Sequence, residues 1–301
     1  MAALPAGMRM TRKRRAMTAE QLKKEIALFT GNKLKNIVVE EPVSRETDAE
    51  ISGRIAERFE ILSELTDASI KGEARALIVS GPAGLGKSFT VEKALETWDP
   101  GRRNHCIIKG NVKTTGLYKL LWQYKNKGQV IVFDDADTVF LDELSLSLLK
   151  AVCDTNDRRV VSYLGEGQLY DEEFGTGKIP KSFEFEGSIV FITNLDFDAM
   201  IEKGNKLAPH LQAMVSRAHY IDLSMKTKRD YLIRIRQVVE QGLLKDRGLT
   251  DEMQKEVVKF IMDHSDKLRE LSLRIALKIA SIRKTNPTRW QNVSRVTCCR
   301  S

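Results

Sequence analysis

The sequence has few of the residues that hold small extracellular or metal-bound proteins together. It contains four cysteines and four histidines in 301 residues. None of the cysteines has Cys-x-x-Cys spacing or a histidine at metal-ligand spacing, so we expect reduced thiols, no zinc site and a cytoplasmic protein. The cysteines are Cys106, Cys153, Cys298 and Cys299.

Long apolar runs are also missing. No run approaches the roughly 20 apolar residues that are needed to cross a bilayer, and charged residues make up 30% of the chain. We therefore expect no membrane partner. The length is sufficient for one α/β domain of about 150 to 200 residues and a smaller module. No internal repeat or low-complexity tract stands out.

Basic residues are in excess. Lysine and arginine number 49 against 41 acidic residues, which gives a formal charge of +8 and favours polyanionic partners such as nucleic acid. Residues 1–17 carry five basic side chains and no acid, at Arg9, Arg12, Lys13, Arg14 and Arg15. Such a segment is typical of a transit peptide, a nucleic-acid-binding arm or a basic tail, and we favour the tail because the segment is short.

One motif predicts a nucleotide site. Residues 81–88 match Gly-x-x-x-x-Gly-Lys-Ser, between an apolar run at 76–80 and a segment with helical character at 88–95. In such a loop, backbone N–H groups at a helix start face the phosphates of ATP or GTP. Lys87 is expected to reach the β and γ phosphates and Ser88 to hold Mg²⁺. The predicted cofactor-binding residues are Gly81, Pro82, Ala83, Gly84, Leu85, Gly86, Lys87, Ser88 and Phe89.

Two further apolar segments end in polar residues that suit this chemistry. Residues 129–133 precede Asp134 and Asp135, an arrangement that places an acid beside Mg²⁺ in P-loop sites. We assign Asp134 to the metal and Asp135 to the polarisation of the attacking water, since neighbouring side chains at a strand end point in opposite directions. The other segment, 188–193, precedes Asn194, which can bond the γ-phosphate or orient the water. Asp137 and Asp142 are predicted to be helix-start or surface acids.

The order of apolar segments predicts an α/β architecture. Short apolar strands alternate with helices from residue 76 to residue 223, which implies a five-stranded parallel sheet. We predict the strands at 76–80, 105–109, 129–133, 188–193 and 219–223. Alternating residues at 158–163 and 182–186 predict an inserted hairpin.

Helices are predicted on both sides of this core. Helical periodicity precedes the strands at 18–29 and 48–65, and it follows them at 228–241, 251–264 and 267–283. The predicted organisation is a basic tail and N-terminal helix (1–47), a core (48–225), a helical module (226–285) and a C-terminal tail (286–301).

Together these motifs resemble the AAA+ ATPase family over about residues 50 to 285. The order is phosphate loop, Asp-Asp strand, Thr-Asn strand, and then a Ser-Arg pair at Ser216 and Arg217 before the last strand. The resemblance implies that Ser88 and Asp134 serve Mg²⁺ and that Asn194 is the first sensor. It also implies that Arg217 is an arginine finger, projecting into a neighbouring subunit of a ring or helical oligomer. The other interpretation of Arg217 is a surface arginine that caps a helix.

The same resemblance makes residues 226–285 the family's lid, with a second sensor arginine on its third helix. Arg269 and Arg274 both suit this position, and we favour Arg274. The second acid of the pair is Asp135, where many family members have glutamate. Its side chain is shorter by one methylene, so hydrolysis is expected to be slow or the water to be placed differently.

The substrate of the motor is less specified. Leu117 and Tyr118 could contact a threaded chain, although a packed helix start is the stronger interpretation. Lys109, Lys113 and Lys119 could line a nucleic-acid channel or belong to a solvated helix end. The hairpin with Arg158 and Arg159 could contact DNA or a protein, or form a solvated edge.

From this pattern we predict an oligomeric ATPase that uses ATP and Mg²⁺ to remodel a nucleic-acid or replication-protein complex. It most resembles phage-type and helicase-loader or initiator-type members of the family. DNA or a DNA-bound protein is the expected partner, together with other copies of the chain. The alternative is a protein-remodelling ATPase of the unfoldase or chaperone kind. A small-molecule kinase is disfavoured, because such an enzyme needs neither the Thr-Asn strand nor the Ser-Arg pair.

Overall fold

The computed structural model describes residues 46–300 except 166, 172–174, 176 and 205. Residues 46–301 form one compact unit, and residues 1–45 are divided from it. The predicted basic tail and the predicted helix at 18–29 lie outside the described residues.

The centre of the fold is a five-stranded parallel sheet with the strand order β2-β3-β8-β1-β9. This confirms the predicted fold class, and each strand end lies within one residue of its predicted position. The apolar segments form strands because both faces of the sheet are covered, so nearly every side chain in the central strands is buried. The strands are β1 (Ala76–Ser80), β2 (His105–Lys109), β3 (Val130–Asp134), β8 (Ser188–Thr193) and β9 (His219–Asp222).

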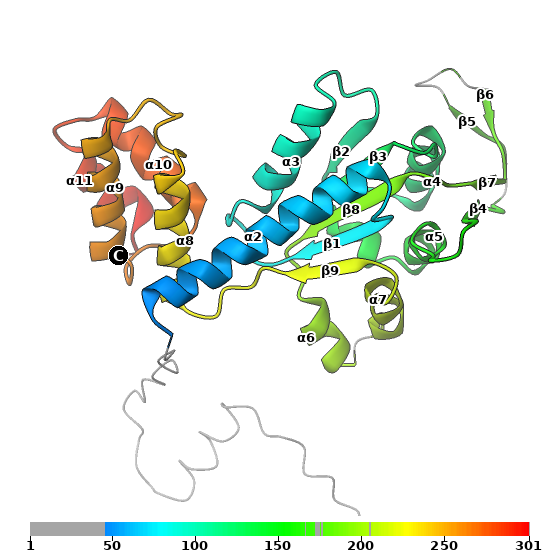
Figure 1. The fold of residues 1–301 in the computed structure, drawn as a ribbon, viewed down its shortest axis with the longest axis horizontal. Coiled ribbons are helices and arrows are strands. Elements are labelled where there is room, and N and C mark those ends of the chain that lie inside the picture. Colours follow the sequence, from blue (N-terminus) through cyan, green and yellow to red (C-terminus); the bar gives the residue numbers. More distant parts are fainter. Residues whose placement is uncertain (1–45, 166, 172–174, 176, 205, 301) are drawn as a thin grey trace, which may run out of the picture. The chain divides into compact units, whose positions relative to one another are not determined.

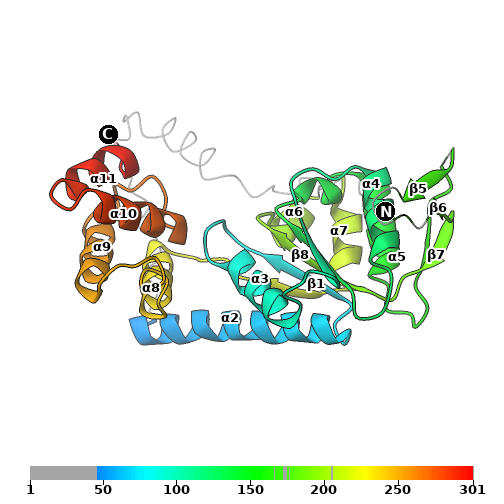
Figure 2. The ribbon, with the colours of Figure 1, turned by 90° about the horizontal axis from the view of Figure 1, so that it is seen from above.

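Helices cover the two faces of the sheet as separate layers (Figures 1 and 2). Successive side chains of a strand point to opposite faces, so Leu77 and Val79 pack with α2 and α3, whereas Ile78 packs with α4, α5 and α7. The helices are α2 (Asp48–Lys71), α3 (Lys87–Trp98), α4 (Thr114–Gln123), α5 (Glu143–Val152), α6 (Phe197–Glu202) and α7 (Ala208–Val215), with a 3₁₀ turn, η1 (Asp137–Phe140), between β3 and α5.

The helix α2 is longer than the sequence pattern predicted and runs to Lys71. It begins with a capping box, in which Thr47 accepts from the N–H of Glu50 and the Glu50 carboxylate accepts from the N–H of Thr47. Its predicted apolar stripe is buried. In the part of the chain that the structure describes, neither α2 nor any other helix is long and apolar enough to cross a membrane.

The insert between α5 and β8 consists of two nested pairs of antiparallel strands. The outer pair joins β4 (Val160–Ser162) to β7 (Ser182–Glu184), and the inner pair joins β5 (Leu169–Asp171) to β6 (Gly177–Ile179). The prediction that Arg159 lies on a charged hairpin surface is wrong. The residue is 5% exposed, and its guanidinium donates to the carbonyls of Val152 and Gly187 at 2.8 and 2.9 Å, so it fastens the insert to the core.

The C-terminal helices share a separate hydrophobic core. They are α8 (Lys228–Glu240), α9 (Asp251–Asp263), α10 (Leu273–Thr285) and α11 (Trp290–Cys298). Two predictions need correction. The third lid helix begins at Leu273 rather than at 267, because Ser272 caps it by accepting from the N–H of Ile275. Residues 286–301 are not a tail: α11 packs against α10 and buries Trp290 and Cys298.

Candidate nucleotide and metal site

The glycine-rich loop joins the end of β1 to the start of α3, which is the strand-loop-helix context that the motif requires. Gly81, Gly84 and Gly86 have φ values of 144°, 76° and 101°, a region that favours glycine. Leu85 is 2% exposed and packs into the core, so it anchors the loop. Phe89 lies in the first turn of α3 and is 60% exposed.

Lys87 is the first residue of α3 and its side chain folds back over the loop. The ammonium donates to the carbonyls of Gly81 and Pro82, the latter at 2.9 Å, and to Oδ1 of Asn194 at 3.0 Å. The residue is 5% exposed, and this burial lowers the pKa of the ammonium to about 8, against which the charges of Asp135 and Asp134 act. Lys87 is therefore a buried cation within hydrogen-bond distance of Asn194, the residue that follows β8.

Ser88, at the start of α3, lies beside Asp134, at the end of β3. The Ser88 hydroxyl donates to Oδ1 of Asp134 at 2.8 Å, and Asp134 is 3% exposed. A hydroxyl and a carboxylate suit Mg²⁺, which prefers oxygen ligands and is bound through one or two carboxylates together with water and substrate phosphates. The pair fits the predicted metal site, although no larger cluster of acidic, histidine or cysteine ligands occurs among the described residues.

Lys109 adds a cation to the same carboxylate. It ends β2, opposite Asp134 in the strand register, and its Nζ lies 3.0 Å from Oδ2 of Asp134 and 2.7 Å from Oε1 of Glu92. The hydrogen bond with Glu92, followed by that with Asp134, raises the pKa of Lys109. Lys109 therefore contributes to the charge balance of the candidate metal site.

Asp135 has an unusual backbone conformation. Its φ is +54°, which places it in the left-handed region that aspartate and asparagine tolerate better than most residues. Its N–H donates to the carbonyl of Ile192 at 2.9 Å, and its Oδ1 accepts from Nδ2 of Asn194 at 2.7 Å. The turn thus presents the carboxylate to Asn194, so that Lys87, Asn194 and Asp135 form one continuous chain of hydrogen bonds.

Asp137 belongs to this group, although the sequence pattern predicts a helix-start or surface acid at this position. Its Oδ1 accepts from the Thr193 hydroxyl at 2.5 Å, and burial raises the pKa of its carboxyl group. This bond fixes the end of β8 directly before Asn194. The only sequence signal was the spacing of three acids at 134, 135 and 137.

Arg217 does not join these residues within the described chain. It lies just after α7, and its Nη1 donates to the carbonyl of Ala213 at 2.9 Å, which closes the last turn of that helix. This contact matches a helix-capping arginine. A role in a neighbouring subunit depends on an assembly and remains a prediction.

The two candidate lid arginines lie in different surroundings. Arg274 is in the first turn of α10, where the neighbouring Leu273 N–H donates to the carbonyl of Gly84 at 2.8 Å. The Arg274 charge is one of the effects that lower the pKa of Lys87. Arg269 instead donates its N–H to the carbonyl of Cys298. Arg274 is therefore the lid arginine beside the loop.

Arg234 of α8 also lies at the loop, and it is not among the residues that the sequence pattern predicts for the site. Its Nε donates to the carbonyl of Leu85 at 3.2 Å, and it is 6% exposed. Nothing in the pattern of α8 separates it from the neighbouring arginines Arg229 and Arg236, so sequence alone gave no signal.

The packed interpretation of Leu117 and Tyr118 is confirmed. Leu117 and Tyr118 are 0% and 1% exposed in α4, so they form a packed helix start, and Tyr118 donates to the carbonyl of Pro180 at 2.8 Å. This is the stronger of the two interpretations given above.

The strand order, the glycine loop after β1, the acids after β3, the asparagine after β8 and the helical lid match the arrangement that the resemblance to the AAA+ ATPase family implies. No protein-family model matches the chain. A phage T4 protein, described as the uncharacterized 36.7 kDa protein in the nrdC-mobD intergenic region, is 37% identical over 252 residues, which cover 83% of this chain and 76% of the phage protein. The chain belongs to the family of this phage protein.

Solved structures of similar arrangement have low sequence identity. The RuvB Holliday junction branch migration motor of Thermotoga maritima is 15% identical with a TM-score of 0.46, covering 81% of this chain and 68% of its own. Domain III of the Thermotoga maritima replication initiation protein DnaA is 12% identical with a TM-score of 0.46, covering 82% and 92%. NtrX from Brucella abortus, in complex with ADP, is 12% identical with a TM-score of 0.40, covering 91% and 66%. At these values the likeness says nothing of substrate.

Proposed function

We propose that the protein binds ATP with Mg²⁺ and hydrolyses it to ADP and phosphate. The observation that carries this proposal is the meeting of three segments at the ends of β1, β3 and β8: Ser88 bonds Asp134 at 2.8 Å, while Lys87 and Asp135 both bond Asn194. Three separate parts of the sequence supply these groups, and each group suits one part of phosphoryl transfer.

In the proposed reaction, each side chain of the site has its own role. The loop N–H groups and Lys87 hold the phosphates, and Lys87 exchanges its bonds to loop carbonyls for bonds to phosphate oxygens. Ser88 and Asp134 hold Mg²⁺, which when bound neutralises charge on the phosphates. Asp135 accepts a hydrogen bond from the attacking water and then its proton, and Asn194 orients both the water and the Asp135 carboxylate. Arg274 adds positive charge from the lid.

We further propose that the active form is a ring or helical oligomer in which Arg217 of one copy completes the site of the next. An arginine at the end of α7 is suited to stabilise charge on the transferring phosphoryl group when a neighbouring copy presents it. The cytoplasmic location expected from the cysteine pattern is part of the same proposal.

DNA or a DNA-bound protein is the partner that we propose for the motor. The support is the distribution of charge: residues 1–45 hold ten lysines and arginines against four acids, so most of the net charge of +8 lies there. A segment of this charge attracts the phosphate backbone without base specificity.

The test is steady-state ATPase activity with no addition, with single-stranded DNA, with duplex DNA and with an unfolded protein. We expect Mg²⁺-dependent ATP hydrolysis that rises with DNA and loses its DNA response as salt increases. Stimulation by the unfolded protein alone would instead support the protein-remodelling alternative. Absence of hydrolysis together with phosphate transfer to a metabolite would overturn the proposal in favour of a kinase.

A further inference from the structure

Arg234 is a buried cation with no acidic partner in the part of the chain that the structure describes. Its side chain leaves the lid helix α8 and is 6% exposed, and burial lowers the pKa of the guanidinium to about 10. No ion pair of Arg234 occurs among the described residues. The guanidinium carbon lies 3.4 Å from the ring centroid of Phe59 in α2, a cation–π contact, and Nε donates to the carbonyl of Leu85.

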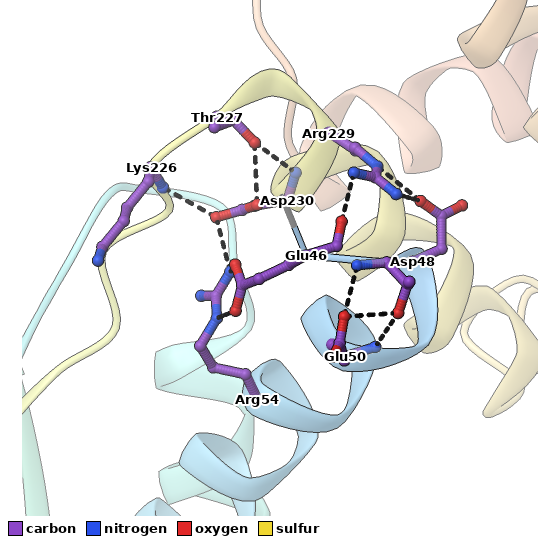
Figure 3. A network of polar contacts seen from close by, with 9 residues as sticks. Glu46, Asp48, Glu50, Arg54, Lys226, Thr227, Arg229 and Asp230 are labelled. Carbon is purple, nitrogen blue, oxygen red and sulfur yellow. Dashed lines mark hydrogen bonds and ion pairs between the residues drawn. The ribbon is translucent and has the colours of Figure 1, made fainter. Parts of the chain in front are cut away.

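The start of α8 is fixed by a network of polar contacts, one turn before Arg234 (Figure 3). Asp230 is 1% exposed and accepts from the Thr227 hydroxyl, from the Lys226 N–H and from Arg54 of α2. Arg229 pairs with Asp48 in the first turn of α2. These contacts satisfy Asp230 with partners other than Arg234, and they hold α8 against α2 so that Arg234 reaches the loop.

The glycines of the loop permit this approach. A side chain at Gly86 would lie 3.6 Å from Nη2 of Arg234 and 3.3 Å from Leu273, and one at Gly84 would lie 2.7 Å from Cβ of Ser272. The lid therefore contacts the loop at two points, through Arg234 at Leu85 and through α10 at Gly84.

A buried charge without a counter-ion is costly, and one carbonyl and one aromatic ring offset only part of that cost. The backbone that Arg234 contacts is the loop whose N–H groups would bind phosphate. An anion in that loop would lower the cost of the buried charge, and more so when the anion carries more charge. The triphosphate gains more from Arg234 than the diphosphate does.

We propose that Arg234 is a positioning residue that holds the phosphate loop from the lid side and makes the site prefer ATP over ADP. It acts through the backbone of Leu85 and through its charge, without touching the nucleotide. The inference rests on the proposed binding of ATP.

The test compares dissociation constants of Mg-ATP and Mg-ADP for the full chain and three variants. R234M removes the charge and the donor, R234Q removes the charge and keeps a donor for the Leu85 carbonyl, and R234K keeps the charge. We expect R234M and R234Q to weaken ATP binding about tenfold and ADP binding about threefold or less, and R234K to retain the ATP preference of the unmodified chain.

R236M is the matched control, because Arg236 lies on the same helix, is 39% exposed and pairs with Asp48 at 3.8 Å. It should bind both nucleotides as the unmodified chain does. A merely structural role for Arg234 would lower the melting temperature and weaken both nucleotides equally. An unchanged ratio of the two dissociation constants in R234Q, with a cooperative thermal transition, would overturn the inference. If the unmodified chain binds neither nucleotide, the proposed function fails as well.

Discussion

Asn194 Nδ2 donates to Oδ1 of Asp135 across 2.7 Å, and this bond joins the ends of the neighbouring strands β3 and β8. The side-chain oxygen of Asn194, Oδ1, accepts from Lys87. One side-chain amide therefore links the cation of the loop to Asp135, the acid that follows β3. A substitution of Lys87 is therefore expected to affect Asp135, and a substitution of Asp135 is expected to affect Lys87.

The first prediction concerns this amide and its acid. D135N keeps the shape of the residue and tolerates the φ of +54°, so the fold is expected to persist while the proton acceptor is lost. We expect kcat to fall by about 10² to 10³-fold with little change in ATP affinity, measured by steady-state hydrolysis and equilibrium binding. N194A should lower kcat in the same direction.

Asp157 provides a control, since its side chain is fully exposed and pairs with Arg75 only at 3.8 Å. D157N should retain full hydrolysis. If D135N hydrolyses ATP at the unmodified rate, Asp135 is not the base, and the half-buried Asp137 becomes the next acid to test.

A second prediction uses the low pKa of Lys87. Its value in the folded protein is about 8, below the ordinary 10.5. Between these pH values the unfolded chain binds more protons than the folded one, so this lysine destabilises the fold most below pH 8 and less as the pH rises. The stability of the unmodified protein should therefore increase relative to K87M by about 2 kcal/mol between pH 7.5 and 9.5.

Urea unfolding of both proteins at several pH values measures this difference, and other titrating groups cancel because both chains contain them. A difference that stays flat with pH would show that Lys87 is not buried as a cation. K87M should also abolish ATP binding at every pH, since the buried ammonium is then missing.

The third prediction concerns assembly. R217A is expected to bind ATP with unchanged affinity and to lose turnover by at least about 10²-fold, because the site of each copy lacks its neighbour's arginine. Mixing R217A with D135N should restore part of the activity, since some sites then combine an intact Asp135 with an intact Arg217. Activity that stays at the level of the separate variants would argue for a site completed within one chain.

A fourth prediction concerns the basic segment. The quadruple variant R12Q/K13Q/R14Q/R15Q should bind DNA more weakly, with a log-log salt slope smaller by up to about three to four for duplex DNA. Hydrolysis without DNA should not change, since these residues lie outside the described unit that holds the site. Fluorescence anisotropy across a salt series measures both quantities.

The matched control removes four exposed lysines from the lid by glutamine substitution. The positions are Lys255, Lys259, Lys267 and Lys278. The lid variant should retain the slope of the unmodified chain. Equal losses in both variants would mean that net charge alone, and not the N-terminal segment, determines DNA binding.

The five strands could be predicted because each is covered on both faces of the sheet. Burial on both faces requires a nearly continuous run of apolar residues, which is visible in the sequence. The nucleotide loop was equally clear, since its glycines, lysine and serine stand at fixed spacing. The proximity of Ser88 to Asp134 followed from parallel pairing, which brings the carboxyl ends of strands to one edge.

The lid was less predictable because its packing depends on partners far apart in the chain. Leu268 and Leu271 continue the helical spacing of the third lid helix, yet the backbone turns there and Ser272 starts the helix anew. Trp290 looked like part of a tail, but it is buried against Phe260 of α9. These contacts are tertiary and override the local pattern.

Polar residues at the site were missed for a related reason. Arg234 looks like any arginine of an amphipathic helix, and only the position of α8 against α2 buries it. Asp137 resembles a helix-start acid, which it also is, and its bond with Thr193 appears only when β3 and β8 are adjacent. Burial of a charged side chain is a property of the assembled fold.

The hydrogen bond from the Leu273 N–H to the Gly84 carbonyl bears on how this protein can be recombined with its relatives. Gly84 leaves no room for a β-carbon opposite Ser272, so loop and lid fit one another closely at this contact. A chimaera that exchanges the C-terminal helices while keeping a foreign loop would join two surfaces that were never matched. In such a chimaera, residues 81–86 and 272–274 must come from the same parent protein.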